Sequence, residues 1–213
     1  MPAIRFSYRG WLLDLDGTVY RGEKLIDGAV EVVSALRGAG RCGAFLSNKP
    51  IQTRSEYAAK LSRLGIPTAA EEVVNSSLVL ARHLGRLDPG APGFVIGEPP
   101  LIGELEAHGF EVRQDDRVRW VMIAAVEAVT GKRVELVVGK PSPLMLEVAL
   151  AVLGLPAAET AIVGDRIETD VVMGKALGLA TVLVLSGVTV PGDPRIAELG
   201  PDHVLASIRE LIQ

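Results

Sequence analysis

The chain has 213 residues and a formal net charge of −4 at pH 7, which gives no electrostatic reason to expect nucleic acid or an anionic membrane as a partner. Apolar residues make up 48% of the sequence but aromatic residues only 4%, so a sizeable core must be filled mainly by aliphatic side chains. Cys42 is the single cysteine, and signal-peptide patterns and bilayer-length apolar stretches are absent, so the sequence predicts a soluble cytoplasmic protein without an intrachain disulfide.

The most informative stretch covers residues 11–20, WLLDLDGTVY. An apolar run that stops abruptly at acids and a glycine predicts a buried strand whose end lies at a site. Asp14 and Asp16 are two residues apart and would project to the same side of an ideal strand. Like charges at that spacing repel each other unless a cation or a shared proton relieves them. The alternative is a solvated junction between a strand and a turn.

The first 70 residues alternate between strand and helix patterns. Residues 18–27 are polar and suit a loop or a short flap, and Asp27 is predicted to cap a helix that ends at two later glycines. An apolar strand over 42–46 stops at Ser47. The sequence TRSE at 53–56 fits a capping box for a helix that Gly65 closes. This alternation predicts a parallel sheet.

Residues 73–131 have a different pattern. We expect a helix that begins at Ser76 or Ser77, a turn at 89–93, a strand at 94–97, a helix at 101–108 and strands at 110–112 and 118–123. The apolar stretch WVMIAAVEAV at 120–129 begins like a strand and continues like a helix, with no turn signal between them. Such a seam is unusual.

The second half returns to alternation. A short apolar run at 136–138 predicts a strand, and Ser142 followed by Pro143 predicts the start of a helix that Gly154 ends. A strand at 161–163, a helix from residue 169 or 170 to 177 and a β-branched strand at 181–185 follow. A short edge strand at 202–205 and a helix at 208–212 close the chain.

Three polar clusters follow the later apolar runs: SNK at 47–49, GKP at 139–141 and GDRIETD at 164–170. The carboxyl ends of successive strands in a parallel sheet share one rim, so these clusters are expected beside Asp14 and Asp16. Together they add two carboxylates, a hydroxyl group and a fixed cation.

With these clusters in this order, the chain resembles the haloacid dehalogenase superfamily of phosphatases. The motifs DLDGTVYRG, SNK, GKPSP and VGDRIETD are similar to those of the branch that includes 4-nitrophenyl phosphatases, phosphoglycolate phosphatases and pyridoxal-phosphate phosphatases. The resemblance covers residues 8–212. It implies an α/β fold, in which a Rossmann-like parallel sheet with helices on both faces forms a core of residues 1–72 and 132–213. Residues 73–131 would form an inserted α/β cap domain.

Against the family pattern this cap is short, about 60 residues, and its middle is expected to be missing at the 120–129 seam. Natural trimming, a deliberate deletion and residues absent from the sequence would each produce such a seam. A shortened cap would expose apolar surface over 118–129, which packing onto the core or self-association as a homodimer would bury.

The resemblance also implies a chemistry. Asp14 would be the nucleophile that forms an aspartyl-phosphate, and Asp16 would be the general acid and later the base that activates water. Mg²⁺ would be held by the Asp14 carboxylate, the Asp16 backbone carbonyl and Asp165, with Asp170 as a direct or water-mediated ligand.

The other residues implied by the resemblance lie around the phosphate: Ser47, Asn48, Gly17, Thr18 and Lys140. Ser47 would donate a hydrogen bond to the phosphoryl oxygens with help from nearby amides, and Lys140 would neutralise the phosphate and the nucleophile. Gly17 and Thr18 would shape the loop and offer backbone amides. Lys49 follows the same strand as Ser47 but is left without a role, because the family gives it none.

The leading hypothesis is a Mg²⁺-dependent phosphatase that acts broadly on small phosphorylated metabolites. Carbon–halogen hydrolysis through the same nucleophile needs neither Asp16 nor the Asp165 and Asp170 pair. A phosphoacceptor module has no use for a proton donor at Asp16. A core kept for binding alone remains the third alternative, with all motif residues retained.

Overall fold

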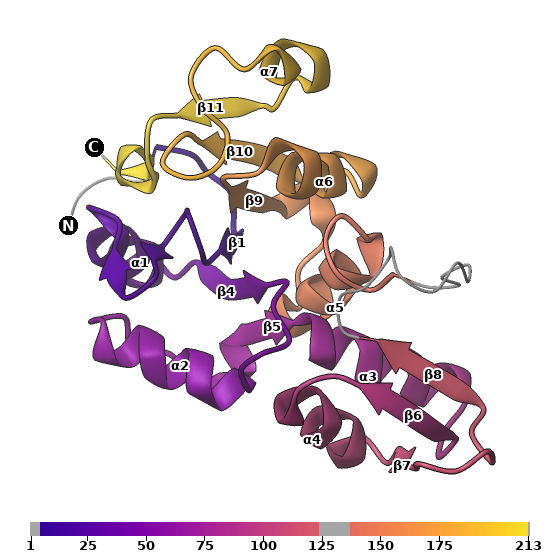
Figure 1. Ribbon diagram of the computed structural model, residues 1–213. Helices are drawn as coiled ribbons and strands as arrows, with labels where there is room; N and C mark the ends of the chain where they lie inside the picture. The colour runs from indigo at the N-terminus through magenta and orange to yellow at the C-terminus, as the bar shows by residue number, and fades with distance from the viewer. Residues whose placement is uncertain (1–4, 124–136, 213) are drawn as a thin grey trace.

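The computed structural model describes residues 5–123 and 137–212, and its centre is a six-stranded parallel sheet. The strand order is β11-β10-β9-β1-β4-β5 (Figure 1). The bounds are β1 Gly10–Asp14, β4 Cys42–Ser47, β5 Val73–Asn75, β9 Thr160–Gly164, β10 Ala180–Val184 and β11 His203–Leu205. This α/β architecture confirms the predicted fold class, and β1 lies in the interior of the sheet because apolar residues cover both of its faces.

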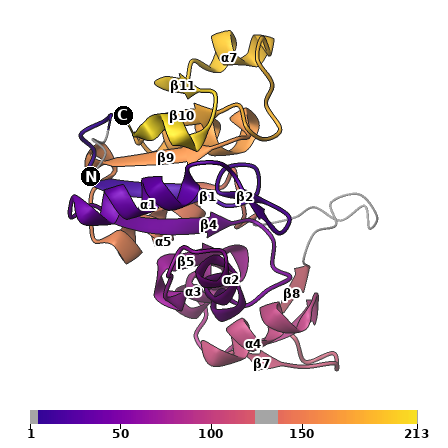
Figure 2. The same ribbon diagram turned by 90° about the vertical axis from the view of Figure 1, so that its left-hand side faces the viewer.

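Helices cover both faces of this sheet (Figures 1 and 2). Trp11 and Leu13 pack on one face with α1 (Ala29–Gly38) and α2 (Arg54–Arg63), whereas Leu12 packs on the other face. That second face carries α5 (Pro143–Leu153) and α6 (Val172–Ala176). The alternation follows from the two-residue repeat of a strand, and all three side chains are 2% exposed or less.

A smaller unit lies beside the core. Its three-stranded parallel sheet has the order β7-β6-β8, with β6 Pro92–Ile96, β7 Glu111–Val112 and β8 Trp120–Ile123. The helix α4 (Pro99–Ala107) and the end of α3 (Ser76–Leu87) pack on this sheet through Leu84, Leu105 and Met122. On β6 and β8, Ile96 and Val121 are exposed.

The helix α3 connects the two units. Leu78 and Val79 near its start belong to the core cluster, whereas Ala81 and Leu84 belong to the cluster of the small sheet. Asn75 caps this helix and is also the last residue of β5. Among the described residues, the small sheet is therefore joined to the edge of the core through α3, and an ion pair between Arg54 of α2 and Glu104 of α4 adds a second contact.

The remaining elements are short. The β2–β3 hairpin, Tyr20–Arg21 and Lys24–Leu25, occupies the segment predicted as a loop or flap. The helix α7 (Pro194–Leu199) was not predicted, and single turns lie at Ala70–Glu72, Ala157–Glu159 and Ile208–Leu211. In the described part of the chain, no helix combines the length and the apolar character that a membrane span requires.

Several details differ from the sequence-based expectation. Gly28, in the left-handed conformation, caps α1, and Asp27 instead pairs with Arg209. Residues 137 and 138 form no strand, while residue 136 lies outside the described residues, as does the 124–129 part of the seam. The boundaries of the cap domain, residues 73 and 131, stay a prediction. The strand β5, at the start of this predicted insert, pairs with β4 in the core sheet.

Candidate active site

The carboxyl edge of the core sheet gathers the polar clusters identified in the sequence. Asp14 ends β1 and is paired in register with Leu46 of β4, the residue before Ser47. β9 lies on the other side of β1, and Asp165 directly follows it. Because parallel strands end at a common rim, these loops line one pocket of about 830 Å³.

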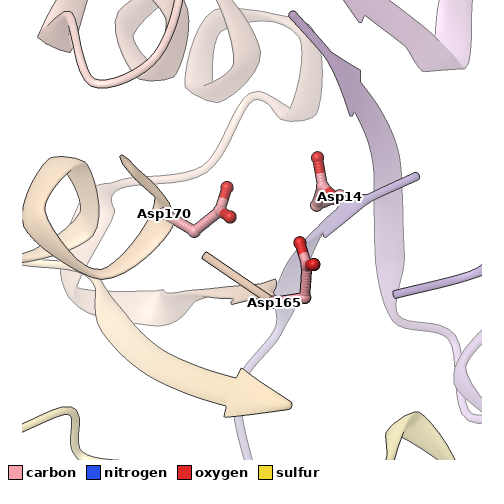
Figure 3. Close-up of side chains that lie close together, drawn as sticks. All are labelled: Asp14, Asp165 and Asp170. Atoms are coloured by element: carbon pink, nitrogen blue, oxygen red, sulfur yellow. The ribbon is translucent and has the colours of Figure 1, made fainter. Parts of the chain in front are cut away.

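Three carboxylates converge at this edge (Figure 3). One carboxylate oxygen from each of Asp14, Asp165 and Asp170 lies within 4.8 Å of the other two. Asp170 comes from a π-helical turn, Ile167–Val171, that follows Asp165. Asp165 and Asp170 are buried. Acids this close cannot all be ionised without a compensating cation.

Lys140 supplies one positive charge to this cluster. Its Nζ donates a hydrogen bond to Asp14 Oδ1 and lies 2.8 Å from Asp170 Oδ1, and its side chain is buried. Burial lowers the pKa of Lys140, but the two carboxylates outweigh burial and hold this pKa above its ordinary value. Lys140 is therefore a charged ammonium group although it is buried.

The acids still carry a surplus of negative charge. Burial raises the pKa of the Asp14 carboxyl to about 7; Lys140 opposes this rise, and the Asp170 charge adds to it. Burial also raises the pKa of Asp165. A divalent cation among the three carboxylates would reduce their mutual repulsion, because a nearby opposite charge favours the ionised form.

The donor set fits such a cation. Asp170 Oδ1 is buried and, among the described residues, has no hydrogen-bond partner of acceptable geometry despite its ion pair with Lys140. Mg²⁺ prefers oxygen ligands and usually keeps several waters. Three of the four predicted metal ligands thus lie together, whereas the Asp16 side chain lies outside this group. Asp16 was expected to contribute its backbone carbonyl instead.

Three glycines make room for the acids. A Cβ at Gly164 would overlap the Asp170 side chain, and a Cβ at Gly17 or Gly187 would overlap the Asp165 carboxylate. Gly17 also has a φ of 98°, which side chains other than glycine rarely adopt. Gly187 was not singled out in the sequence, although it follows β10 at the same edge of the sheet.

Asp16 is placed differently from Asp14. It lies beyond the end of β1, so the ideal-strand argument that put both carboxylates on one side does not apply. Its side chain is 47% exposed, and Lys49 Nζ lies 2.6 Å from Asp16 Oδ2. The hydrogen bond from Lys49 lowers the pKa of Asp16. The family resemblance gives Lys49 no role, although its place two residues after Ser47, at the end of the same strand, is a usable signal.

Ser47 and Asn48 have distinct surroundings. Ser47 is buried, and its Oγ donates a hydrogen bond to the Tyr57 hydroxyl at 2.9 Å. Asn48 Oδ1 accepts a hydrogen bond from the Lys140 backbone N–H at 2.7 Å, and its Nδ2 donates to the Lys140 carbonyl at 3.4 Å. The Asn48 side chain therefore fixes the loop that carries Lys140.

Gly17 lines the pocket, but Thr18 does not. Thr18 is fully buried, and within the described part of the chain its hydroxyl has no hydrogen-bond partner. The Gly17 amide donates to the Tyr20 carbonyl and the Thr18 amide to the Leu15 carbonyl. Both amides are thus used in the turn before the hairpin, and the phosphate-binding role of Gly17 and Thr18 stays a prediction.

The pocket wall is strongly charged. Five basic residues line it: Arg21, Lys49, Lys60, Lys140 and Arg166. A second groove of about 800 Å³ lies between the start of α2 and α4 and shares only Ile51 with the first. The second groove contains none of the predicted site residues, so the chemistry belongs to the pocket at the sheet edge.

The chain is similar in sequence to known hydrolases. A family model described as haloacid dehalogenase-like hydrolase matches residues 11–111, and a second model described as HAD-hydrolase-like matches residues 137–211. The chain is 34% identical to the sugar-phosphatase AraL of Bacillus subtilis, in an alignment that covers 96% of this chain and 92% of the relative. That alignment extends over 253 positions, so it includes positions of the relative that have no counterpart among these 213 residues.

Solved structures are similar in fold. The 4-nitrophenylphosphatase from Thermotoga maritima superposes with a TM-score of 0.88 at 26% identity, covering 96% of each chain. The glycerol phosphate phosphatase from Mycobacterium tuberculosis, solved in complex with magnesium, gives a TM-score of 0.83 at 26% identity, covering 97% of this chain and 77% of the other.

Proposed function

Because the chain belongs to the haloacid dehalogenase-like hydrolase family and is a phosphoric monoester hydrolase of that type, we propose that it hydrolyses small phosphomonoesters through an aspartyl-phosphate on Asp14, with Mg²⁺ as its cofactor. The observation that carries the proposal is the convergence of Asp14, Asp165 and Asp170 around the Lys140 ammonium group. Sugar phosphates are the proposed substrate class, supported by the relative named a sugar phosphatase.

In the first half-reaction, a carboxylate oxygen of Asp14 attacks phosphorus. The bond between phosphorus and the alcohol oxygen breaks, and its electron pair stays with that oxygen. Asp16 transfers a proton to the same oxygen, so a neutral alcohol leaves. The Ser47 hydroxyl, after rotating away from the Tyr57 hydroxyl, donates to the phosphoryl oxygens, and the Lys140 ammonium group faces their negative charge.

In the second half-reaction, the ionised Asp16 takes a proton from a water molecule. The water oxygen attacks phosphorus, the bond between phosphorus and Asp14 breaks, and inorganic phosphate leaves. The net change is the addition of one water across the ester bond, with both aspartates returned to their starting states.

The protonation states of the free protein must change when substrate binds. Lys49 holds the pKa of Asp16 below its ordinary range, but a phosphoryl dianion placed beside Asp16 would favour the protonated form. When bound by Asp14, Asp165, Asp170 and the Asp16 carbonyl, Mg²⁺ would supply positive charge that keeps Asp14 ionised and polarises the phosphoryl group.

We further propose that the enzyme is broad in specificity because residues 73–131 form a shortened cap. The exposure of Ile96 and Val121 on the small sheet supports an incomplete cap, as do the unmatched positions of the relative. A cap that covers the pocket poorly would contact little of the substrate beyond the phosphate. The same exposed side chains are where a homodimer would form, and the single cysteine fits a cytoplasmic location.

Assays with 4-nitrophenyl phosphate and glycerol phosphate, with Mg²⁺ and with a chelator, test the proposal. We expect turnover only with Mg²⁺, none in Asp14→Asn, and a loss of about 10²–10⁴-fold in Asp16→Asn, the usual share of general acid–base catalysis. Circular dichroism would establish that both variants are folded. Near-normal activity in Asp14→Asn would exclude the aspartyl-phosphate mechanism.

A further inference from the structure

Asp16 lacks the enclosure that holds the other acids of the site. Asp14 is 13% exposed and contacts the buried Lys140, whereas the Asp16 side chain is 47% exposed and follows the end of β1. Among the described residues, Lys49 is the one side chain that donates a hydrogen bond to Asp16. The Gly22 backbone also donates to this carboxylate, so Lys49 is the side-chain contact, among the described residues, that orients Asp16.

Lys49 is itself held firmly at its backbone. Its N–H donates to Ser47 Oγ at 3.3 Å, and its carbonyl accepts a hydrogen bond from the Tyr57 hydroxyl at 3.0 Å. Tyr57 is 2% exposed, because α2 packs it against the core sheet. The Lys49 side chain extends across the pocket from the loop after β4 to Asp16 in the loop after β1.

We propose that Lys49 is a positioning residue that holds the Asp16 carboxylate over the pocket, at the place from which it reaches the departing alcohol oxygen and the attacking water. The inference rests on the proposed function of Asp16. It assigns the three consecutive residues at the end of β4 different tasks: Ser47 faces the phosphate, Asn48 fixes the Lys140 loop, and Lys49 orients Asp16.

Two simpler roles for Lys49, a purely structural one and substrate binding, would give different kinetic results. An exposed ion pair contributes little to stability, so a purely structural Lys49 would leave turnover unchanged when removed. A Lys49 that binds substrate would change the Michaelis constant for every substrate and would act independently of Asp16. A positioning residue acts through Asp16 and has no effect once Asp16 is gone.

The experiment compares Lys49→Met, Lys49→Arg, Asp16→Asn and the double variant of Lys49→Met with Asp16→Asn, each with Mg²⁺. Lys175→Met is the matched control, since Lys175 is an exposed lysine of α6 that does not line the pocket. Glycerol phosphate releases an alkoxide that needs a proton, whereas 4-nitrophenyl phosphate releases a stable phenolate. The two substrates therefore differ in their demand on Asp16.

We expect Lys49→Met to lower kcat/KM for glycerol phosphate by about 10- to 100-fold, the scale of a misplaced catalytic group, and by less for 4-nitrophenyl phosphate. Lys49→Arg should recover most of this loss, Lys175→Met should match the parent, and Lys49→Met should cost nothing further in the Asp16→Asn background.

Additive losses in the double variant, or an equal rise of the Michaelis constant for both substrates, would overturn the positioning role in favour of substrate binding. Unchanged kinetics in Lys49→Met would also overturn it. A parent enzyme without Mg²⁺-dependent turnover would instead contradict the proposed function, and the positioning role with it.

Discussion

Lys140 Nζ lies 2.8 Å from Asp170 Oδ1, and the two side chains are only 4% and 2% exposed. The pair links the loop before α5 to the turn after β9, two segments that also border Asp14. Removing one partner of a buried pair is costly because the other charge is left without compensation.

Lys140→Met should therefore destabilise the metal-free protein by about 3–5 kcal/mol, because Asp14 and Asp170 lose a buried counter-charge. Urea denaturation in the presence of a chelator at pH 8 measures this change. The exposed Lys175→Met should remain within about 0.5 kcal/mol of the parent. Matching curves for Lys140→Met and the parent would contradict the electrostatic role of Lys140.

Mg²⁺ should stabilise the folded protein, because the unfolded chain disperses the ligands. At about 100 times the dissociation constant, the expected gain is about 2.7 kcal/mol. Thermal denaturation across a Mg²⁺ titration should show a rising melting temperature in the parent and a much smaller rise in Asp165→Asn. The same rise in both proteins would place the metal elsewhere.

The pKa of Asp14, raised to about 7 from an ordinary 3.8, predicts a pH dependence in the metal-free protein. The protonated form favours the folded state, so this contribution is complete below about pH 4 and is lost as pH rises towards 7. In chelator, the unfolding free energy of the parent should fall relative to Asp14→Asn between about pH 4 and 7. A difference that stays constant over this range would show that Asp14 titrates normally.

Gly187→Ala should weaken metal binding, because its Cβ would overlap the Asp165 carboxylate and displace it. We expect Mg²⁺ affinity, measured from the Mg²⁺ dependence of turnover, to fall by about 10- to 100-fold. Gly85→Ala is the matched control: its Cβ meets no atom within 4 Å, and the exchange lies within α3. The control should gain about 0.5–1 kcal/mol of stability and keep its Mg²⁺ affinity.

The proposed incomplete cap predicts weak discrimination among substrates. A panel of sugar phosphates, nucleotides, glycerol phosphate and pyridoxal phosphate under one set of conditions should give similar kcat/KM values and high Michaelis constants, because remote binding energy is small. A preference of about a thousandfold for one member would show that the described cap still selects its substrate.

Local patterns were enough to predict much of this protein. The acid motif after an apolar run predicted that β1 ends at a site, and the capping box Thr53–Glu56 and the Ser142-Pro143 signal predicted the starts of α2 and α5. Such signals can be recognised in the sequence because each depends only on residues within four positions of one another. The motif order carried the resemblance, which supplied Asp14, Asp165, Asp170 and Lys140.

Tertiary structure decided the rest. The sheet order places the β4 and β1 loops side by side, which brings Lys49 to Asp16 across 33 positions of sequence. The space around the Asp165 carboxylate depends on Gly187, which comes from a third loop. Thr18 lies outside the pocket because the turn buries its side chain. No local pattern encodes these outcomes, because they depend on distances between side chains that only the folded sheet brings together.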